Sequence, residues 1–129
     1  MESTHGLIWW SELMTRDPAR ARDYYAALTG WTFTAMPTSG GTYEVANREG
    51  RPVAGIMDIS GLPGMEAVPA HWFTYIAVAD VDAAVAATRA AGGQVIKDVF
   101  DVPEVGRIAI ITDPTGAALG IMTPAAPPA

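Results

Sequence analysis

The sequence has no cysteine, only two histidines and no apolar run that approaches the roughly 18 residues of a membrane span. Without cysteine there are no disulfides, thiolate nucleophiles or cysteine-ligated metal sites. The start of the chain, from Met1 to His5, also lacks the basic residues and apolar core of a signal peptide. We therefore expect a cytoplasmic protein that does not use a membrane as a partner.

Basic charge is scarce as well. Eight basic residues stand against fourteen acidic ones, which gives a formal net charge of −6. There is no basic stripe that could follow a phosphate backbone, so we expect no nucleic-acid partner. The common catalytic motifs are missing too: no Gly-x-Ser-x-Gly, no phosphate loop, no Gly-x-Gly-x-x-Gly and no His-Glu-x-x-His.

What the sequence does contain is a repeat. A strand-like segment, a capping Asp, an Ala-rich helical segment and a terminal Gly occur at about residues 8–31 and again 63 positions later, so that Asp17 matches Asp80 and Gly30 matches Gly93. Gly55-Ile56-Met57 likewise recurs as Gly120-Ile121-Met122. At 129 residues the chain is long enough for one domain.

Each repeat is predicted to be a β-α-β-β-β module. The first covers about residues 7–58, a connector covers 59–70, and the second covers about 71–123. In the first helix, about 18–28, we expect Tyr24, Tyr25 and Leu28 to share one face and Arg20 and Arg22 to point to water.

The repeated order, together with the turn Asp113-Pro114-Thr115-Gly116 before a short apolar strand, resembles the vicinal oxygen chelate superfamily. This is the group of glyoxalases, bleomycin-resistance proteins and extradiol dioxygenases. The resemblance implies an α+β fold in which two tandem β-α-β-β-β modules form an eight-stranded, open, barrel-like sheet with outer helices. It also implies a cleft enclosed by that sheet, built from modules of one chain or of two.

Metal enzymes of that superfamily take ligands from four equivalent positions. By the resemblance, these positions fall here at Trp10, Gly55, Phe73 and Gly120, and no side chain among them can coordinate a divalent metal. We therefore expect no cofactor. Divalent metal held by other ligands is the alternative.

Strand alternation places Ile8, Trp10 and Glu12 on one face, and His71, Phe73 and Tyr75 on the matching face of the second module. If the resemblance holds, this face lines the cleft, and Gly55 and Gly120 leave room within it. Aromatic rings and one carboxylate suit a small aromatic or apolar organic ligand. The candidate ligand-binding residues are Trp10, Glu12, Tyr43, Met57, His71, Phe73, Tyr75 and Met122.

Each candidate also has a structural interpretation. Trp10 and Phe73 could fill a collapsed core, Glu12 could be solvated or ion-paired rather than a general base, and His71 could cap a strand. His5 is expected in a short flexible arm. Three functions stay open. The first is a binding protein resembling bleomycin-resistance proteins. The second is an enzyme of lyase, isomerase or other small-molecule type, with Glu12 as its catalytic base or with metal ligands elsewhere, and the third is a dimerising or regulatory module whose cleft is filled. Exposed apolar sheet edges favour a homodimer.

Overall fold

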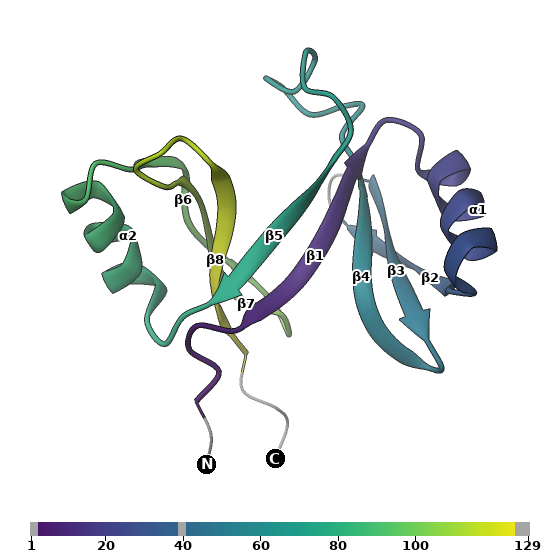
Figure 1. Ribbon diagram of the computed structural model, residues 1–129, viewed down its shortest axis with the longest axis horizontal. Helices are drawn as coiled ribbons and strands as arrows, with labels where there is room; N and C mark the ends of the chain where they lie inside the picture. Colours follow the sequence, from purple (N-terminus) through teal and green to yellow (C-terminus); the bar gives the residue numbers. More distant parts are fainter. Residues whose placement is uncertain (1–2, 39–40, 126–129) are drawn as a thin grey trace. The chain divides into compact units, whose positions relative to one another are not determined.

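The structure is a computed structural model that describes residues 3–38 and 41–125. It contains eight strands and two helices in the order β-α-β-β-β, twice (Figure 1). In chain order they are β1 (Ile8–Thr15), α1 (Pro18–Thr29), β2 (Thr32–Thr38), β3 (Gly41–Arg48), β4 (Arg51–Asp58), β5 (His71–Ala77), α2 (Val81–Ala90), β6 (Gln94–Val102), β7 (Gly106–Thr112) and β8 (Ala118–Pro124). The predicted α+β class is confirmed, as are the two tandem β-α-β-β-β modules and the eight strands in an open arrangement. In the described part of the chain the strands run in mixed directions and do not close.

The chain divides into two compact units. The central unit is residues 10–73, and the flanking unit combines residues 1–9 with 74–129. In the central unit the strand order is β2-β3-β4-β1, with β1 parallel to β4 and the other pairs antiparallel. In the flanking unit the order is β5-β8-β7-β6, with β5 parallel to β8.

Helix α1 begins and ends where the sequence predicts. The Asp17 carboxylate accepts the N–H of Arg20 at 3.1 Å, Pro18 takes the first helical position, and Gly30 ends the helix with a φ of 76°. A left-handed φ of this kind is one that glycine adopts without strain. The two landmarks used to detect the repeat are therefore real helix boundaries.

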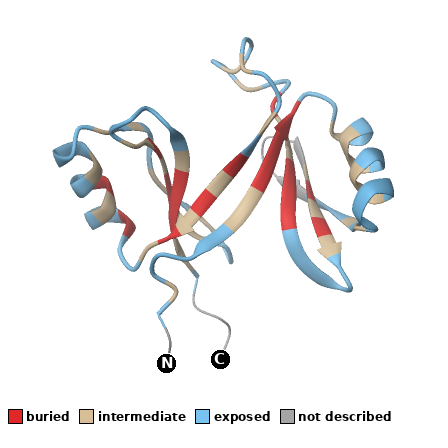
Figure 2. Cartoon of the chain, in the orientation of Figure 1, coloured by how far each residue is buried: buried red, intermediate tan, exposed pale blue. Residues whose placement is uncertain are grey.

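The expectation that Arg22 of α1 points to water is wrong, and two of the residues expected on its apolar face are not buried. Tyr24 is 59% exposed and Leu28 is 60% exposed, and α1 has no buried residue, as its tan and blue colouring in Figure 2 shows. The side chain that turns inward is Arg22, whose Nη1 lies 3.1 Å from Oε2 of the buried Glu44 on β3. An ion pair, rather than an apolar stripe, orients this helix on its sheet.

Aromatic rings support the same helix from the side. The Tyr25 ring stacks on Trp31 with centroids 6.0 Å apart and meets Trp72 edge-on at 5.4 Å. The indole N–H of Trp72 also donates to the Tyr25 hydroxyl at 3.1 Å. Such ring pairs stabilise by about 0.5–1.5 kcal/mol beyond the area that they bury.

The flanking unit has an ordinary apolar core beneath its helix. Asp80 caps α2 by accepting the N–H of Ala83 at 3.1 Å, and Val81 and Val85 of the helix are buried. These two valines belong to one buried cluster with Ala109, Ile111 and Ile121 of the sheet. The side chain of Ile121 therefore lies on the face of β8 that α2 covers.

The Asp113 turn before β8 is tightly hydrogen-bonded. The Asp113 carboxylate accepts hydrogen bonds from the hydroxyl and the N–H of Thr115, each at 2.7 Å, and from the N–H of Ala117 at 3.1 Å. These donors stabilise the ionised form, so the pKa of Asp113 lies below its usual value.

The expectation of a flexible N-terminal arm is wrong for its described residues. Gly6 N–H donates to the carbonyl of Ala77 at 2.7 Å, and the N–H of Ala77 donates to Leu7 at 2.9 Å. Nδ1 of His5 accepts the N–H of Ala79 at 2.9 Å. Pairing with the end of β5 thus begins before β1 itself; residues 1 and 2 of the arm lie outside the described chain.

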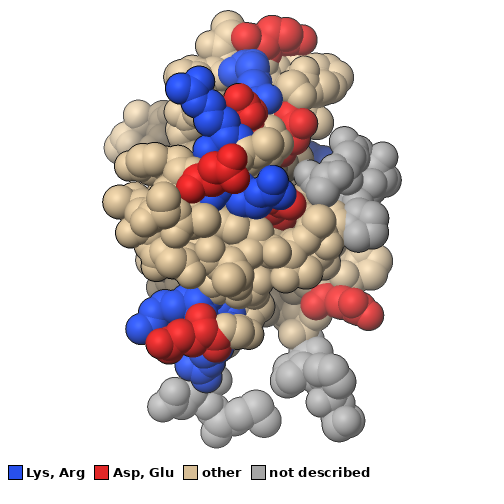
Figure 3. Space-filling view, turned by 90° about the vertical axis from the view of Figure 1, so that its right-hand side faces the viewer, with Lys and Arg blue, Asp and Glu red and all other residues tan. Residues whose placement is uncertain are grey.

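On the face shown in Figure 3, blue and red atoms are mixed in a group at the top and in another at the lower left, and an isolated acidic patch lies at the lower right. This mixture does not form the basic stripe that a nucleic-acid surface needs. Within residues 3–38 and 41–125, no helix is long and apolar enough to cross a membrane.

Candidate functional site

The two faces of the central sheet can be told apart by the ion pair on β3. Because Arg22 of α1 bonds to Glu44, the side chain of Glu44 lies on the face that α1 covers. Neighbouring residues of a strand point to opposite faces, so Tyr43 lies on the face turned away from α1. Residues that contact the Tyr43 side chain share that face.

Two predicted site residues meet Tyr43 there. The indole N–H of Trp10 donates to the Tyr43 hydroxyl oxygen at 2.9 Å, and this hydroxyl donates to Oε2 of Glu12 at 2.7 Å. Glu12 is only 7% exposed, whereas Trp10 and Tyr43 are half-buried. Trp10 and Glu12 therefore point away from α1, as strand alternation predicts, and they form one hydrogen-bonded group with Tyr43.

Gly55 makes the close approach of Tyr43 to the sheet possible. A Cβ atom at position 55 would lie 1.7 Å from the Tyr43 hydroxyl oxygen and 2.3 Å from its Cζ atom. Gly55 is also the register partner of Glu12 in the parallel pair of β1 and β4. The expectation that Gly55 leaves room is therefore wrong, because the tip of the Tyr43 ring occupies that space.

Gly120 of the flanking unit is filled in a similar way. A Cβ atom there would lie 2.2 Å from Cδ2 of Tyr75, which is the register partner of Gly120. Since Ile121 faces α2, Gly120 and the ring above it lie on the opposite face of the sheet. The room predicted at Gly120 is therefore also taken by a tyrosine ring.

The other candidate ligand-binding residues lie on β4, β5 and β8. Met57 on β4 is the register partner of Tyr43, and Met122 on β8 is the register partner of Ala77. Phe73 is buried and its ring meets that of His71 edge-on at 6.3 Å. Nδ1 of His71 lies 2.8 Å from the carbonyl oxygen of Pro69.

The four positions that the resemblance predicts for the superfamily's metal ligands do not fit a divalent cation here. Trp10 and Phe73 have no donor that such a cation accepts, and tyrosine rings lie where side chains at Gly55 and Gly120 would stand. In the described part of the chain, no group of three or more His, Cys, Asp or Glu side chains is arranged to hold a metal.

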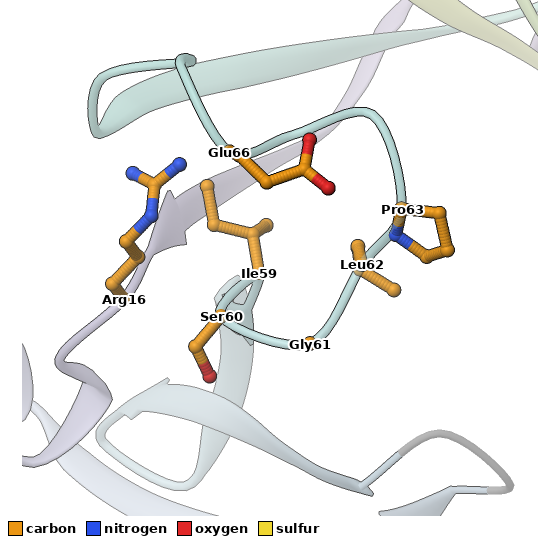
Figure 4. Close-up of a pocket in the computed structure, with 7 residues that line it drawn as sticks. All are labelled: Arg16, Ile59, Ser60, Gly61, Leu62, Pro63 and Glu66. Atoms are coloured by element: carbon orange, nitrogen blue, oxygen red, sulfur yellow. The ribbon is translucent and has the colours of Figure 1, made fainter.

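A pocket of about 350 Å³ lies on the connector and was not foreseen from the sequence (Figure 4). It is formed by Arg16 and Glu66 with residues 59–63. The Arg16 guanidinium is already used, because it donates to the carbonyls of Met65 and Val68 and so ties the connector to the end of β1. This pocket has no aromatic lining, and we do not identify it with the Trp10, Tyr43 and Glu12 site.

Two carboxylates away from the Trp10, Tyr43 and Glu12 site, Asp58 and Asp82, have pKa values below the usual one. The hydroxyl and N–H of Ser60 hold the pKa of Asp58 below its usual value, and Arg107 does the same for Asp82 through its guanidinium. Arg107 bonds at 2.9 Å to both Asp82 and Asp101, and its own pKa rises in consequence. That arginine is therefore engaged in ion pairs of the flanking unit.

The strand order and the two capped helices define a fold class of paired β-α-β-β-β modules, and solved structures share it. Methylmalonyl-CoA epimerase from Streptomyces coelicolor, in a complex with 2-nitronate-propionyl-CoA, matches with a TM-score of 0.70 at 19% identity, covering 96% of this chain and 100% of that one. The epimerase from Mycobacterium tuberculosis matches with a TM-score of 0.66 at 15% identity, covering 98% and 94%.

The family follows from the sequence comparison. The model of the Glyoxalase/Bleomycin resistance protein/Dioxygenase superfamily matches residues 8–121, and the chain belongs to this superfamily. "Putative glyoxylase CFP32" of Mycobacterium tuberculosis is 41% identical over 121 residues, which cover 93% of this chain and 45% of the relative. "Anthracycline biosynthesis protein DnrV" of Streptomyces peucetius is 35% identical over 123 residues, covering 87% and 45%. The chain thus spans about half the length of these relatives.

Proposed function

We propose that this protein binds a small aromatic or apolar organic molecule against Trp10, Tyr43 and Glu12, without a metal ion at the four family positions. The observation that carries the proposal is the pair of hydrogen bonds that joins these residues on the face turned away from α1. Both rings are half-buried, so part of each remains available for stacking. Glu12 supplies a carboxylate to a ligand's donor or positive charge.

The printed name of one relative supports the choice of ligand class. DnrV is named for anthracycline biosynthesis, and anthracyclines are planar, polycyclic and aromatic. A planar polycycle is the shape that stacks best on an indole and a phenol.

The test is a binding screen read by tryptophan fluorescence, with planar polycyclic compounds that include an anthracycline. We expect one compound to saturate at one site per chain. Trp10→Ala should weaken the affinity for this compound at least about tenfold, as loss of an aromatic residue buried by a ligand does. Trp9→Ala is the matched control, since Trp9 is the neighbouring residue on the opposite face of β1 and is 40% exposed. Equal losses in both variants would place the ligand elsewhere.

A second candidate function is catalysis with Glu12 as general base. The observation in its favour is a carboxylate that is 7% exposed and held in place by the Tyr43 hydroxyl. A relative named as a glyoxylase and epimerases of the same fold make acid–base chemistry a reasonable hypothesis.

Catalysis is tested by turnover of the compounds that bind. Glu12→Gln should abolish turnover while leaving binding measurable, and Glu44→Gln should preserve turnover because Glu44 lies on the other face of the sheet. Turnover that survives Glu12→Gln would contradict the role of Glu12 as base.

We also propose a homodimer that uses sheet edges. β2 and β6 are edge strands, and they expose Met36 (46%) and Ile96 (59%). Sedimentation velocity should show a species of twice the chain mass, and Met36→Lys or Ile96→Lys should dissociate it. A monomer at all concentrations would contradict this proposal.

A further inference from the structure

The hydrogen bonds at the candidate site run in one direction, from the Trp10 indole through the Tyr43 hydroxyl to the Glu12 carboxylate. An indole N–H can only donate, and an ionised carboxylate can only accept. The Tyr43 hydroxyl lies between them: it accepts from Trp10, at 2.9 Å, and donates to Glu12, at 2.7 Å. This single hydroxyl connects the charged residue of the site with its largest ring.

The sheet holds that hydroxyl in one place. Its oxygen would be 1.7 Å from a Cβ atom at position 55, so it lies directly over the backbone of Gly55. Gly55 is the register partner of Glu12, and this pairing brings the Tyr43 hydroxyl next to the Glu12 carboxylate. Any larger residue at position 55 would force the hydroxyl away.

The repeat shows that the fold does not need this arrangement. Met57 and Met122 are equivalent by the repeat, and their register partners are Tyr43 on β3 and Ile108 on β7. The offset of 63 residues makes Phe73 and Tyr75 the equivalents of Trp10 and Glu12. The second module thus forms the same strands without the indole, the carboxylate or a phenol at position 108.

We propose that Tyr43 is the positioning residue of the binding site and couples the charge of Glu12 to the indole N–H of Trp10. This inference rests on the proposed function. An ionised carboxylate draws the hydroxyl proton toward itself, which makes the tyrosine oxygen a better acceptor for the indole. A ligand that gives a hydrogen bond or a positive charge to Glu12 competes for that carboxylate, and the change is transmitted to Trp10.

The experiment follows the indole N–H resonance of Trp10 by NMR in the ligand-free, nitrogen-15-labelled full chain, with Trp10→Phe to assign it. Tyr43→Phe should move the resonance because its hydrogen bond is lost. Glu12→Gln should move it when residue 43 is Tyr and leave it unmoved when residue 43 is Phe. Equal shifts on Glu12→Gln in both backgrounds would overturn the coupling.

Two matched controls separate coupling from general perturbation. Glu44→Gln neutralises the carboxylate of a neighbouring residue of Tyr43 on the other face, and it should leave the Trp10 resonance in place. Gly55→Ala should reproduce the shift of Tyr43→Phe, whereas Gly93→Ala, whose Cβ would lie 2.4 Å from the carbonyl of Thr112, should not. If Glu44→Gln shifts Trp10 as far as Glu12→Gln does, the coupling is refuted.

Binding supplies the second readout. For a compound found in the screen, Tyr43→Phe and Glu12→Gln should each weaken affinity about tenfold, and the double variant should be no weaker than the stronger single variant. Additive losses would count against the coupling while leaving the proposed function intact. A coupled Trp10 resonance with no compound bound would count against the proposed function alone.

Discussion

The assignment of the site to one face of the sheet depends on the ion pair between Arg22 and Glu44, and its loss has a calculable effect. Nη1 of Arg22 lies 3.1 and 3.4 Å from the two oxygens of Glu44, a residue that is 7% exposed. Hydrogen bonds to charged groups stabilise by about 1.5–3 kcal/mol. Because the Arg22 side chain is 43% exposed, water screens the pair and the lower end of this range applies.

We therefore expect Arg22→Met to lower the free energy of unfolding by about 1.5 kcal/mol. Methionine keeps most of the alkyl stem in place, so the loss reports the guanidinium rather than its packing. For a chain of 129 residues this corresponds to a fall in Tm of about 5 °C.

Urea unfolding followed by circular dichroism measures this change. Arg20→Met, two residues earlier on the same helix and exposed, is the matched control and should cost no more than about 0.5 kcal/mol. A double-mutant cycle with Glu44→Gln should give a coupling of about 1 kcal/mol.

Equal effects of Arg22→Met and Arg20→Met, with no coupling to Glu44, would refute the reasoning in a specific way. Glu44 would then not face α1, and strand alternation would no longer place Tyr43 on the opposite face. The group of Trp10, Tyr43 and Glu12 would lose its position in the fold.

Three further predictions test the caps, the turn and the glycine of the site. Asp80→Ala should destabilise by about 1 kcal/mol, because the Ala83 N–H loses its acceptor; unchanged amide protection in α2 would contradict this. The pKa of Asp113 is lowered by hydrogen bonds from residues 115 and 117, so its contribution to stability is present above about pH 4 and is lost as pH falls through the lowered folded-state pKa. Asp113→Asn should therefore make Tm fall less steeply as the pH is lowered. An unchanged slope of Tm against pH would contradict this prediction. Gly55→Ala should cost about 1–3 kcal/mol through overpacking against Tyr43, and Tyr43→Ser should relieve that cost; a persistent cost would point to the backbone instead.

The features predicted correctly from the sequence have local causes. Asp17 and Asp80 cap their helices through a carboxylate that reaches a backbone N–H three residues later, and Gly30 supplies a left-handed backbone. Such interactions depend on a few neighbouring residues, so their signature is visible in the chain. Their recurrence at one offset then indicated the two modules.

The features that were missed depend on partners far away in the sequence. The inward side of α1 is set by Glu44, 22 positions after Arg22, and helical periodicity carries no information about that partner. The N–H of Ala79 is 74 residues from His5, so the attachment of the N-terminal arm could not be read locally. The position of the Tyr43 ring over Gly55 could not be predicted from the local sequence either, because it depends on the register of β3 against β4.

The space beside Gly55 and Gly120, the two glycines expected at the family's metal positions, is filled by rings from different strands, and this difference separates the modules. Over Gly120 the ring comes from its direct partner Tyr75, whereas over Gly55 it comes diagonally from Tyr43, because the direct partners of Gly55 are Glu12 and Val45. Because the ring comes from Tyr43 on β3, the direct partner of Gly55 on β1 can be Glu12, whose carboxylate lies within reach of the Tyr43 hydroxyl. A metal-ligating side chain at position 55 would displace that hydroxyl and separate Glu12 from Trp10. In the first module, then, the packing of Tyr43 that excludes a side chain at position 55 also joins Glu12 to Trp10.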